Sequence, residues 1–288
     1  MRIGHNISIR GWLPWGLLLG LVVALGALFP QGMLARGIYV VTRNLVSWYT
    51  VYGYPGYLTM TGKNVVVRYR PGDQADAGLV LAGAEEYYGR VMADFGVSPT
   101  GRVPVVVYPT ATSLNNSFGW AGDLNAMGAY WAGVIRVVAP STWIDVGSPQ
   151  VERDIFFDEG PMAHELTHFA VDELTGGNCP RWLQEGLAQW EEMQLTGFQL
   201  PPPDSGTWYS MDDLSNHFDS LTDQSAAYYQ SLAAVTYMYK HFGPDQVTNL
   251  LHRLRAGESM EQAMSGTLGE KPADFAVQYQ KFAAANLD

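Results

Sequence analysis

Cysteine is almost missing from this chain: Cys179 is the single example in 288 residues. One thiol excludes an internal disulfide and also a zinc site made of four cysteines. A metal ion in this protein would therefore need histidine and carboxylate ligands. Because Cys179 precedes a proline that can start a helix, we interpret it as a small packed residue.

Acidic residues are absent from residues 1–72, so all 28 Asp and Glu lie in the remainder of the chain. The net charge is −11 at pH 7 and the isoelectric point is about 4.9. This balance excludes nucleic acid as the main partner. The asymmetry along the chain predicts two parts that occupy different physical environments.

Charge of either sign is absent from residues 11–35, whose centre reads LLLGLVVALGALF. A helix of this length can cross roughly 30 Å of hydrocarbon. We therefore predict a transmembrane anchor in residues 1–36 that contacts the lipid bilayer through residues 11–35. The alternative is a cleaved secretory signal, although the following LFPQGMLARG lacks a small-x-small cleavage pattern. The basic amino-terminal segment favours a single-pass protein of the cell membrane with its large acidic part outside the cytoplasm.

The rest of the chain divides into a short segment and one folded domain. Residues 37–62 are rich in Tyr and Trp and are predicted to form a membrane-proximal stalk; the alternative is a first helix packed on the domain. Residues 63–288 are predicted to form the domain. Its first half contains the predicted strands 64–70, 103–109 and 128–140, the last being one strand or a hairpin, and a helix over 76–96. Its second half contains the predicted helices 161–174, 180–195, 225–242, 244–255 and 272–286. A small mixed sheet followed by an all-helical half indicates the α+β class.

Histidine is also scarce, yet two of the six histidines lie four apart in AHELTH, residues 163–168. On a helix this spacing places His164 and His168 one above the other on the same face. Two neutral imidazoles on one helical turn suit zinc. Glu165, next to the first histidine, can accept a proton from a metal-bound water. The pattern therefore predicts a catalytic zinc site.

Such a site needs a third protein ligand and an open fourth position. The helix predicted after Pro180 reads RWLQEGLAQWEE, and Glu185 on it lies seventeen residues beyond His168. Two antiparallel helices would bring this carboxylate opposite the histidines, and Gly186 would permit a close helix approach. Other glutamates compete for the role at this point: Glu173, Glu191 and Glu192.

HELTH followed by WLQEGLAQW resembles the gluzincin metallopeptidases, and most closely the peptidase MA-like domains, over roughly residues 63–288. The resemblance implies a zincin-like fold and one Zn²⁺ per chain. It implies His164, His168 and Glu185 as the zinc ligands and Glu165 as the general base.

The same resemblance extends to residues around the ligands. FAVD after the second histidine resembles thermolysin-like enzymes and makes Asp172 a candidate to fix the tautomer of His168, with a plain salt-bridging role as the alternative. Gln189 is a weaker candidate of the same kind. The segment YYQSLAAV resembles the helix that carries an oxyanion-stabilising tyrosine, which selects Tyr228 with Tyr229 as the alternative.

The substrate is expected to be a peptide or protein. The strand GAYWAGVIRVV can pair with an extended peptide at its edge, so that Ala129, Tyr130 and Trp131 line the cleft. This strand lacks the GAMEN-type exopeptidase signature, which favours an endopeptidase over an aminopeptidase. We therefore predict a membrane-anchored zinc metallopeptidase that hydrolyses peptide bonds with a zinc-bound water activated by Glu165. The alternative is a catalytically silent scaffold or binding protein with the same fold at the membrane.

Overall fold

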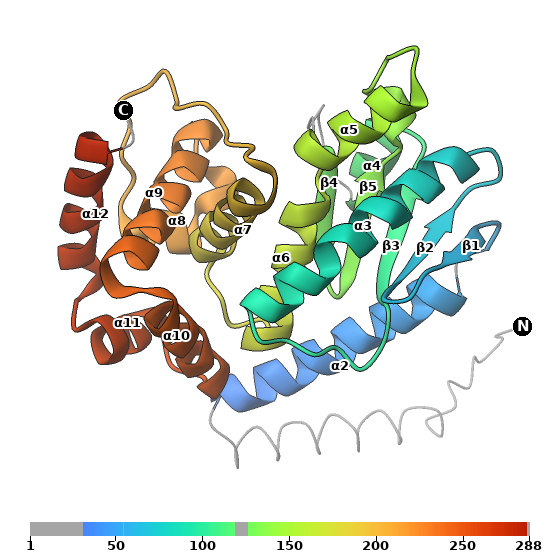
Figure 1. The fold of residues 1–288 in the computed structure, drawn as a ribbon. Helices are drawn as coiled ribbons and strands as arrows, with labels where there is room; N and C mark the ends of the chain where they lie inside the picture. The colour runs from blue at the N-terminus through green and yellow to red at the C-terminus, as the bar shows by residue number, and fades with distance from the viewer. Residues whose placement is uncertain (1–30, 54, 119–125, 287–288) are drawn as a thin grey trace, which may run out of the picture.

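The structure of the chain, a computed structural model, describes residues 31–53, 55–118 and 126–286. A five-stranded sheet with flanking helices forms one part, and helices from the second half of the chain form the other (Figure 1). This arrangement confirms the predicted α+β class, with a small mixed sheet before a helical half.

The sheet has the strand order β1-β2-β3-β5-β4. Strands β2, β3 and β5 are parallel to one another, while β1 and β4 pair antiparallel at the two edges. The three central strands are buried along their whole length, which explains their near-continuous runs of valine. The strands are β1 (Leu58–Thr61), β2 (Val65–Tyr69), β3 (Val103–Tyr108), β4 (Gly128–Trp131) and β5 (Val134–Val138).

Strands β4 and β5 form the hairpin that the sequence left open as one strand or two. Their two-residue turn is Ala132-Gly133, with φ of 50° and 81°. A turn with two positive φ values matches the right-handed twist of the paired strands. The hairpin leaves β4 as the outer strand beside the second half of the molecule, with Ala129 opposite Arg136.

Helices cover both faces of the sheet. Helix α3 crosses one face and also packs against α6, whereas α2 and α4 pack on the other face (Figure 1). Helices α7 and α9 pack on each other, and α7 lies beside α6. The longer helices are α2 (Gln31–Tyr52), α3 (Gln74–Asp94), α4 (Ala111–Phe118), α5 (Pro149–Glu159), α6 (Met162–Thr175), α7 (Arg181–Thr196), α9 (Gln224–Phe242), α10 (Pro244–Ala256), α11 (Met260–Leu268) and α12 (Pro272–Asn286). The shorter ones are η2 (Pro140–Thr142), α8 (Met211–Asn216) and η3 (Phe218–Ser220).

The five helices predicted for the second half are confirmed, and each bound differs by at most one residue. Helices α5, α8 and α11 were not predicted. Gly186 does permit a close helix approach, although the neighbour is α9 and not α6. A Cβ at Gly186 would lie 2.3 Å from the carbonyl oxygen of Ser231, so α7 and α9 pack at a distance that only glycine permits.

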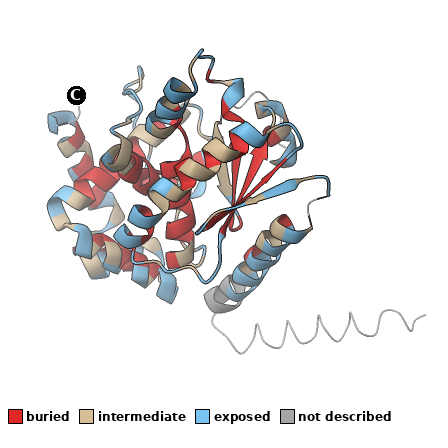
Figure 2. Cartoon of the chain, turned by 45° about the vertical axis from the view of Figure 1, so that its right-hand side comes forward, coloured by how far each residue is buried: buried red, intermediate tan, exposed pale blue. Residues whose placement is uncertain are grey.

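The segment 37–62 differs from the predicted stalk. It contains most of α2, which packs on the sheet, and all of β1, which is an edge strand of the sheet. One face of α2 is buried through Arg43 and Thr50, while Val41, Leu45 and Trp48 on its outer face are more than half exposed (Figure 2). The alternative of a first helix packed on the domain therefore describes this segment. Its acid-free and strongly apolar composition hid the periodicity of the buried face.

The predicted location in the cell membrane, with one spanning helix, is contradicted. Throughout the part of the chain that the structure describes, no helix has both the length and the apolar character needed to cross a bilayer. Most of the predicted anchor, up to residue 30, lies outside the described residues.

Candidate metal centre

Helix α6 carries the two histidines of the predicted metal site. It starts after Pro161 and ends at Gly176, which adopts the left-handed conformation with φ of 62°. His164 and His168 project from the same side of the helix, with ring centroids 4.8 Å apart. The spacing of four residues therefore gives the expected pair of imidazoles.

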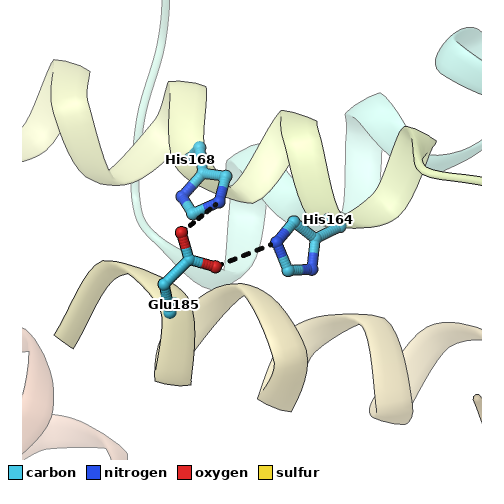
Figure 3. Close-up of side chains that lie close together, drawn as sticks. All are labelled: His164, His168 and Glu185. Carbon is cyan, nitrogen blue, oxygen red and sulfur yellow. Dashed lines mark ion pairs between the residues drawn. The ribbon is translucent and has the colours of Figure 1, made fainter. Parts of the chain in front are cut away.

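Helix α7 brings Glu185 to the same point (Figure 3). The Oε2 atom of Glu185 lies 3.3 Å from Nε2 of His164, and its Oε1 atom lies 3.5 Å from Nε2 of His168. One ligand atom from each of the three residues falls within 4.8 Å of the others. In a tetrahedral zinc site with metal–ligand distances of about 2.0–2.1 Å, neighbouring ligand atoms lie about 3.4 Å apart. The separations from Glu185 to both imidazoles fit this geometry.

The buried polar atoms of the centre also fit a bound cation. Glu185 is 1% exposed, and neither of its carboxylate oxygens has a hydrogen-bond partner among the described residues. Arg181 forms an ion pair with this carboxylate, and its Nη1 lies 2.7 Å from Oε1. Burial by itself raises the pKa of Glu185, but Arg181 and the imidazoles outweigh this effect and hold the pKa well below its usual range. These neighbours favour the charged form of the carboxylate, which is the form that can bind a metal ion.

Glu192 orients the first histidine. Its Oε2 lies 3.1 Å from Nδ1 of His164. With a metal ion bound, a proton on Nδ1 held by this contact would leave the lone pair of Nε2 free to coordinate the ion. Glu192 competed with Glu185 as a ligand at the level of sequence. In the structure it contacts the imidazole from outside the ligand cluster.

Glu165 is the acid beside the ligands. It is 5% exposed, and its Oε2 has no hydrogen-bond partner among the residues that the structure describes. Burial, aided by the nearby charges of Glu185 and Glu192, raises its pKa to about 7. Gly128 of β4 packs directly against it, because a Cβ there would lie 2.9 Å from Oε1. A side chain at this position would push against Glu165.

A cavity of about 950 Å³ opens in front of these residues. All three predicted cleft residues of β4, Ala129, Tyr130 and Trp131, line it. Tyr228 of α9 also lines it, and nearby Glu185 together with burial raises the pKa of its hydroxyl, which therefore stays protonated. Tyr229, the alternative, packs instead against Trp208, with ring centroids 6.3 Å apart, and is not among the residues that form the cavity wall.

Asp172 does not contact His168, and its ion pair with Arg43 fits the salt-bridging alternative instead, although the residue is buried and not at the surface. Its carboxylate accepts hydrogen bonds from the hydroxyls of Tyr130 and Tyr39, the latter at 2.7 Å, and pairs with Arg43 at 2.6 Å. The Nδ1 atom of His168 has no hydrogen-bond partner within the described ranges. Asp172 lies one turn beyond His168, but its side chain turns toward α2 and β4. Tyr130, which donates to Asp172, stacks on His168 with ring centroids 6.4 Å apart.

Gln189 likewise contacts backbone and not a ligand side chain. Its Nε2 donates to the carbonyl oxygens of Glu185, at 3.2 Å, and Tyr228, at 3.0 Å. These bonds connect α7 to α9 and tie the backbone of Glu185 to that of Tyr228.

The contacts of Asp172 identify a buried ion pair that joins α2 to α6. Arg43 is 8% exposed and pairs with both Asp172 and Glu173, the latter at 2.8 Å. We expect Arg43→Met to lower the free energy of unfolding by about 3–5 kcal/mol, because it leaves a buried carboxylate without its partner. Thermal denaturation should show a fall in Tm of roughly 10 °C.

The matched control is Arg90→Met, which removes an exposed ion pair with Asp94 and should leave Tm nearly unchanged. An Arg43→Met/Asp172→Asn double variant should recover part of the loss, because the unpaired charge is removed as well. Equal Tm values for Arg43→Met and the control would show that the pair does not fasten α2.

Two neighbours of the centre, Arg181 and Arg43, were missed at the level of sequence, and Glu192 was considered there only as a competing ligand. Arg181 lies one turn before Glu185, so helical spacing alone places it on the same face. This signal was present and was not used. The role of Arg43 had no such signal, because Arg43 and Asp172 are far apart in the chain and meet only through packing.

Comparison with known families agrees with this geometry. The model of the peptidase MA superfamily matches residues 83–285, which include α6, α7 and α9 with every candidate residue of the centre. A search of curated proteins finds no match. The matched family points to a peptidase, and its typical dependence on a metal agrees with the cluster of His164, His168 and Glu185. The chain belongs to the peptidase MA superfamily.

Proposed function

We propose that this protein is a zinc-dependent metallopeptidase of the gluzincin type, with one zinc ion held by His164, His168 and Glu185. The main support is that the carboxylate oxygens of Glu185 lie 3.3 Å and 3.5 Å from the two Nε2 atoms, close to the edge of a tetrahedral zinc site, and that one ligand atom from each residue lies within 4.8 Å of the others. Two imidazoles and one carboxylate are also a ligand set used by catalytic zinc, which keeps its fourth position open. The adjoining cavity gives a substrate access to that position.

The proposed reaction divides the chemistry between the metal and the chain. When bound, zinc supplies a Lewis acid that polarises the peptide carbonyl and acidifies a water molecule. Glu165 accepts a proton from the attacking water and then donates it to the leaving amine. Tyr228 donates a hydrogen bond to the carbonyl oxygen as negative charge develops there. Both side chains line the same cavity as the ligands.

The substrate is proposed to bind as an added strand. An outer strand presents unpaired backbone groups, and β4 has β5 on one side and the cavity on the other. An extended peptide paired along Ala129, Tyr130 and Trp131 would pass Glu165, which packs against Gly128 of the same strand. The absence of the GAMEN-type sequence in β4 supports an endopeptidase.

Metal analysis together with a cleavage assay tests the proposal. The purified chain should contain one zinc per molecule and should cleave internally quenched peptides from a mixed library. Removal of zinc by a chelator should abolish cleavage, and zinc should restore it. A chain with stoichiometric zinc and no hydrolysis of any peptide would refute the peptidase function while leaving the metal site intact.

Tyr228→Phe tests the oxyanion role. We expect kcat to fall by about 10²-fold with little change in KM, because the hydroxyl acts mainly on the charge of the transition state. Tyr229→Phe is the matched control and should stay within about 2-fold of the parent, since this ring packs away from the cavity. A larger loss for Tyr229→Phe than for Tyr228→Phe would reassign the role.

A further inference from the structure

A buried cation in the cavity wall has no function in the proposed reaction. Arg136 of β5 is 8% exposed and lines the cavity. Its Nη1 donates two long hydrogen bonds, 3.3 Å to the carbonyl oxygen of Trp131 and 3.4 Å to that of Val134. Among the described residues, no carboxylate lies within ion-pair distance of Arg136.

The other two arginines near the centre are compensated. Arg43 pairs with Asp172 and Glu173, and Arg181 pairs with Glu185 and Asp219. A buried charge is unfavourable unless an opposite charge or strong hydrogen bonds offset it. Within the described residues, two carbonyl oxygens at long distance leave the guanidinium of Arg136 with unused hydrogen-bonding capacity.

Two aromatic rings hold this guanidinium in place. Its central carbon lies 4.9 Å from the ring centroid of Phe118 and 5.6 Å from that of Trp131. Both rings belong to the cavity wall, and Trp131 is 53% exposed. A guanidinium stacked on aromatic faces keeps its edge free to bind a carboxylate through two parallel hydrogen bonds. The arrangement is therefore that of a preformed anion subsite.

The subsite lies one strand position away from the proposed general base. Gly128 contacts Glu165, and the next residue, Ala129, is paired with Arg136. Side chains alternate across a strand, so Ala129 and Trp131 share the face of Arg136, while Gly128 is on the face of Glu165. An extended peptide added to β4 alternates in the same way, and a residue near its scissile bond would direct its side chain toward Arg136.

We propose that Arg136 binds a carboxylate of the substrate and gives the enzyme a preference for peptides with an acidic group near the cleaved bond. This inference rests on the proposed peptidase function. The carboxylate comes from an Asp or Glu side chain or from the carboxyl terminus of the peptide, which offer the same chemistry. A peptide carboxylate supplies the charge and the hydrogen-bond acceptors that the guanidinium does not find among the residues that the structure describes.

The test uses the full zinc-loaded chain and one peptide series. The series starts from a peptide that the enzyme cleaves, made with an amidated carboxyl terminus. Each position around its scissile bond is replaced in turn by Glu, Gln or Lys. A second form of the peptide contains no acidic side chain and has a free carboxyl terminus. We expect kcat/KM to favour Glu over Gln by about 10- to 100-fold at one position, as a charged hydrogen bond provides. If the carboxyl terminus is the natural ligand, the free form will gain this factor over its amide and the Glu series will not.

Variants of Arg136 identify the residue that makes the difference. Arg136→Gln should reduce the Glu:Gln ratio of kcat/KM to about 1, and Arg136→Glu should reverse the preference toward Lys. Arg153→Gln is the matched control, because Arg153 also stacks on an aromatic ring, Phe157, but is outside the cavity wall. If the parent enzyme cleaved every peptide of the series, amidated or free, with the same kcat/KM, this result alone would overturn the proposal.

A binding measurement separates failure of the subsite from failure of the proposed function. The same peptides are titrated by fluorescence anisotropy into the chain carrying Glu165→Gln, with and without Arg136→Gln. Tighter binding of the acidic peptide that Arg136→Gln abolishes supports the subsite even if the parent cleaves no peptide. Equal affinities for the acidic and neutral peptides overturn it even if the parent is an active peptidase.

Discussion

Glu165→Gln is expected to lower kcat by about 10³-fold or more and to leave the zinc content at one per chain. The amide has the shape of the carboxylate but accepts no proton, so the attacking water loses its base. Glu165 lies beside the ligands without belonging to the cluster of ligand atoms, so the metal should stay bound. Steady-state cleavage of a quenched peptide and metal analysis by mass spectrometry measure the two quantities on the same sample.

Glu159→Gln is the matched control. It makes the same chemical change at an exposed position at the end of α5, and kcat should stay within about 2-fold of the parent. Unchanged kcat in Glu165→Gln would assign the base elsewhere. If the parent hydrolysed no peptide, and Glu165→Gln kept every other activity that can be measured in the parent, the silent scaffold would be favoured over the enzyme.

Glu185→Gln is expected to weaken zinc binding by more than about 100-fold and to abolish activity at limiting zinc. The neutral amide is a poor zinc ligand, and its loss leaves two imidazoles where a catalytic zinc requires three protein ligands. The isosteric change retains the volume of a side chain that is 1% exposed, so packing against α6 is preserved. Zinc competition against a chromogenic chelator gives the affinity, and circular dichroism confirms the fold.

Glu192→Gln gives the graded comparison. It removes the carboxylate that contacts Nδ1 of His164 and leaves the three ligands in place. A neighbour of this kind typically changes metal affinity by about 10- to 100-fold. If Glu192→Gln lost zinc more completely than Glu185→Gln, Glu192 would be the third ligand and the assignment of Glu185 would be wrong.

The first half of the chain shows how composition can mislead. The absence of acids and the aromatic richness of residues 37–62 predicted a stalk, but this segment contains a helix that packs on the sheet and is fastened by Arg43. The sequence of α2 has apolar residues on both sides, because Val41, Leu45 and Trp48 face outward in the described structure. Periodicity cannot identify the buried face of such a helix.

Local spacing determined much of the centre in advance. Four residues make one helical turn, which places His164 beside His168, and the proline and glycine residues around α6 and α7 mark where the two helices start and stop. The order of strands and helices likewise determined the α+β class. These features depend on backbone geometry, which repeats in any helix or strand.

Only the tertiary structure decided which side chains meet across elements. Asp172 has the correct helical spacing to reach His168, yet it binds Tyr39, Arg43 and Tyr130 because α2 and β4 offer stronger partners on that side. The choice between Glu185 and Glu192, and the exposure of Arg136 to the cavity, depend in the same way on how whole elements pack. Spacing along one helix shows which residues share a face, but the partner of that face is determined by packing between segments distant in the chain.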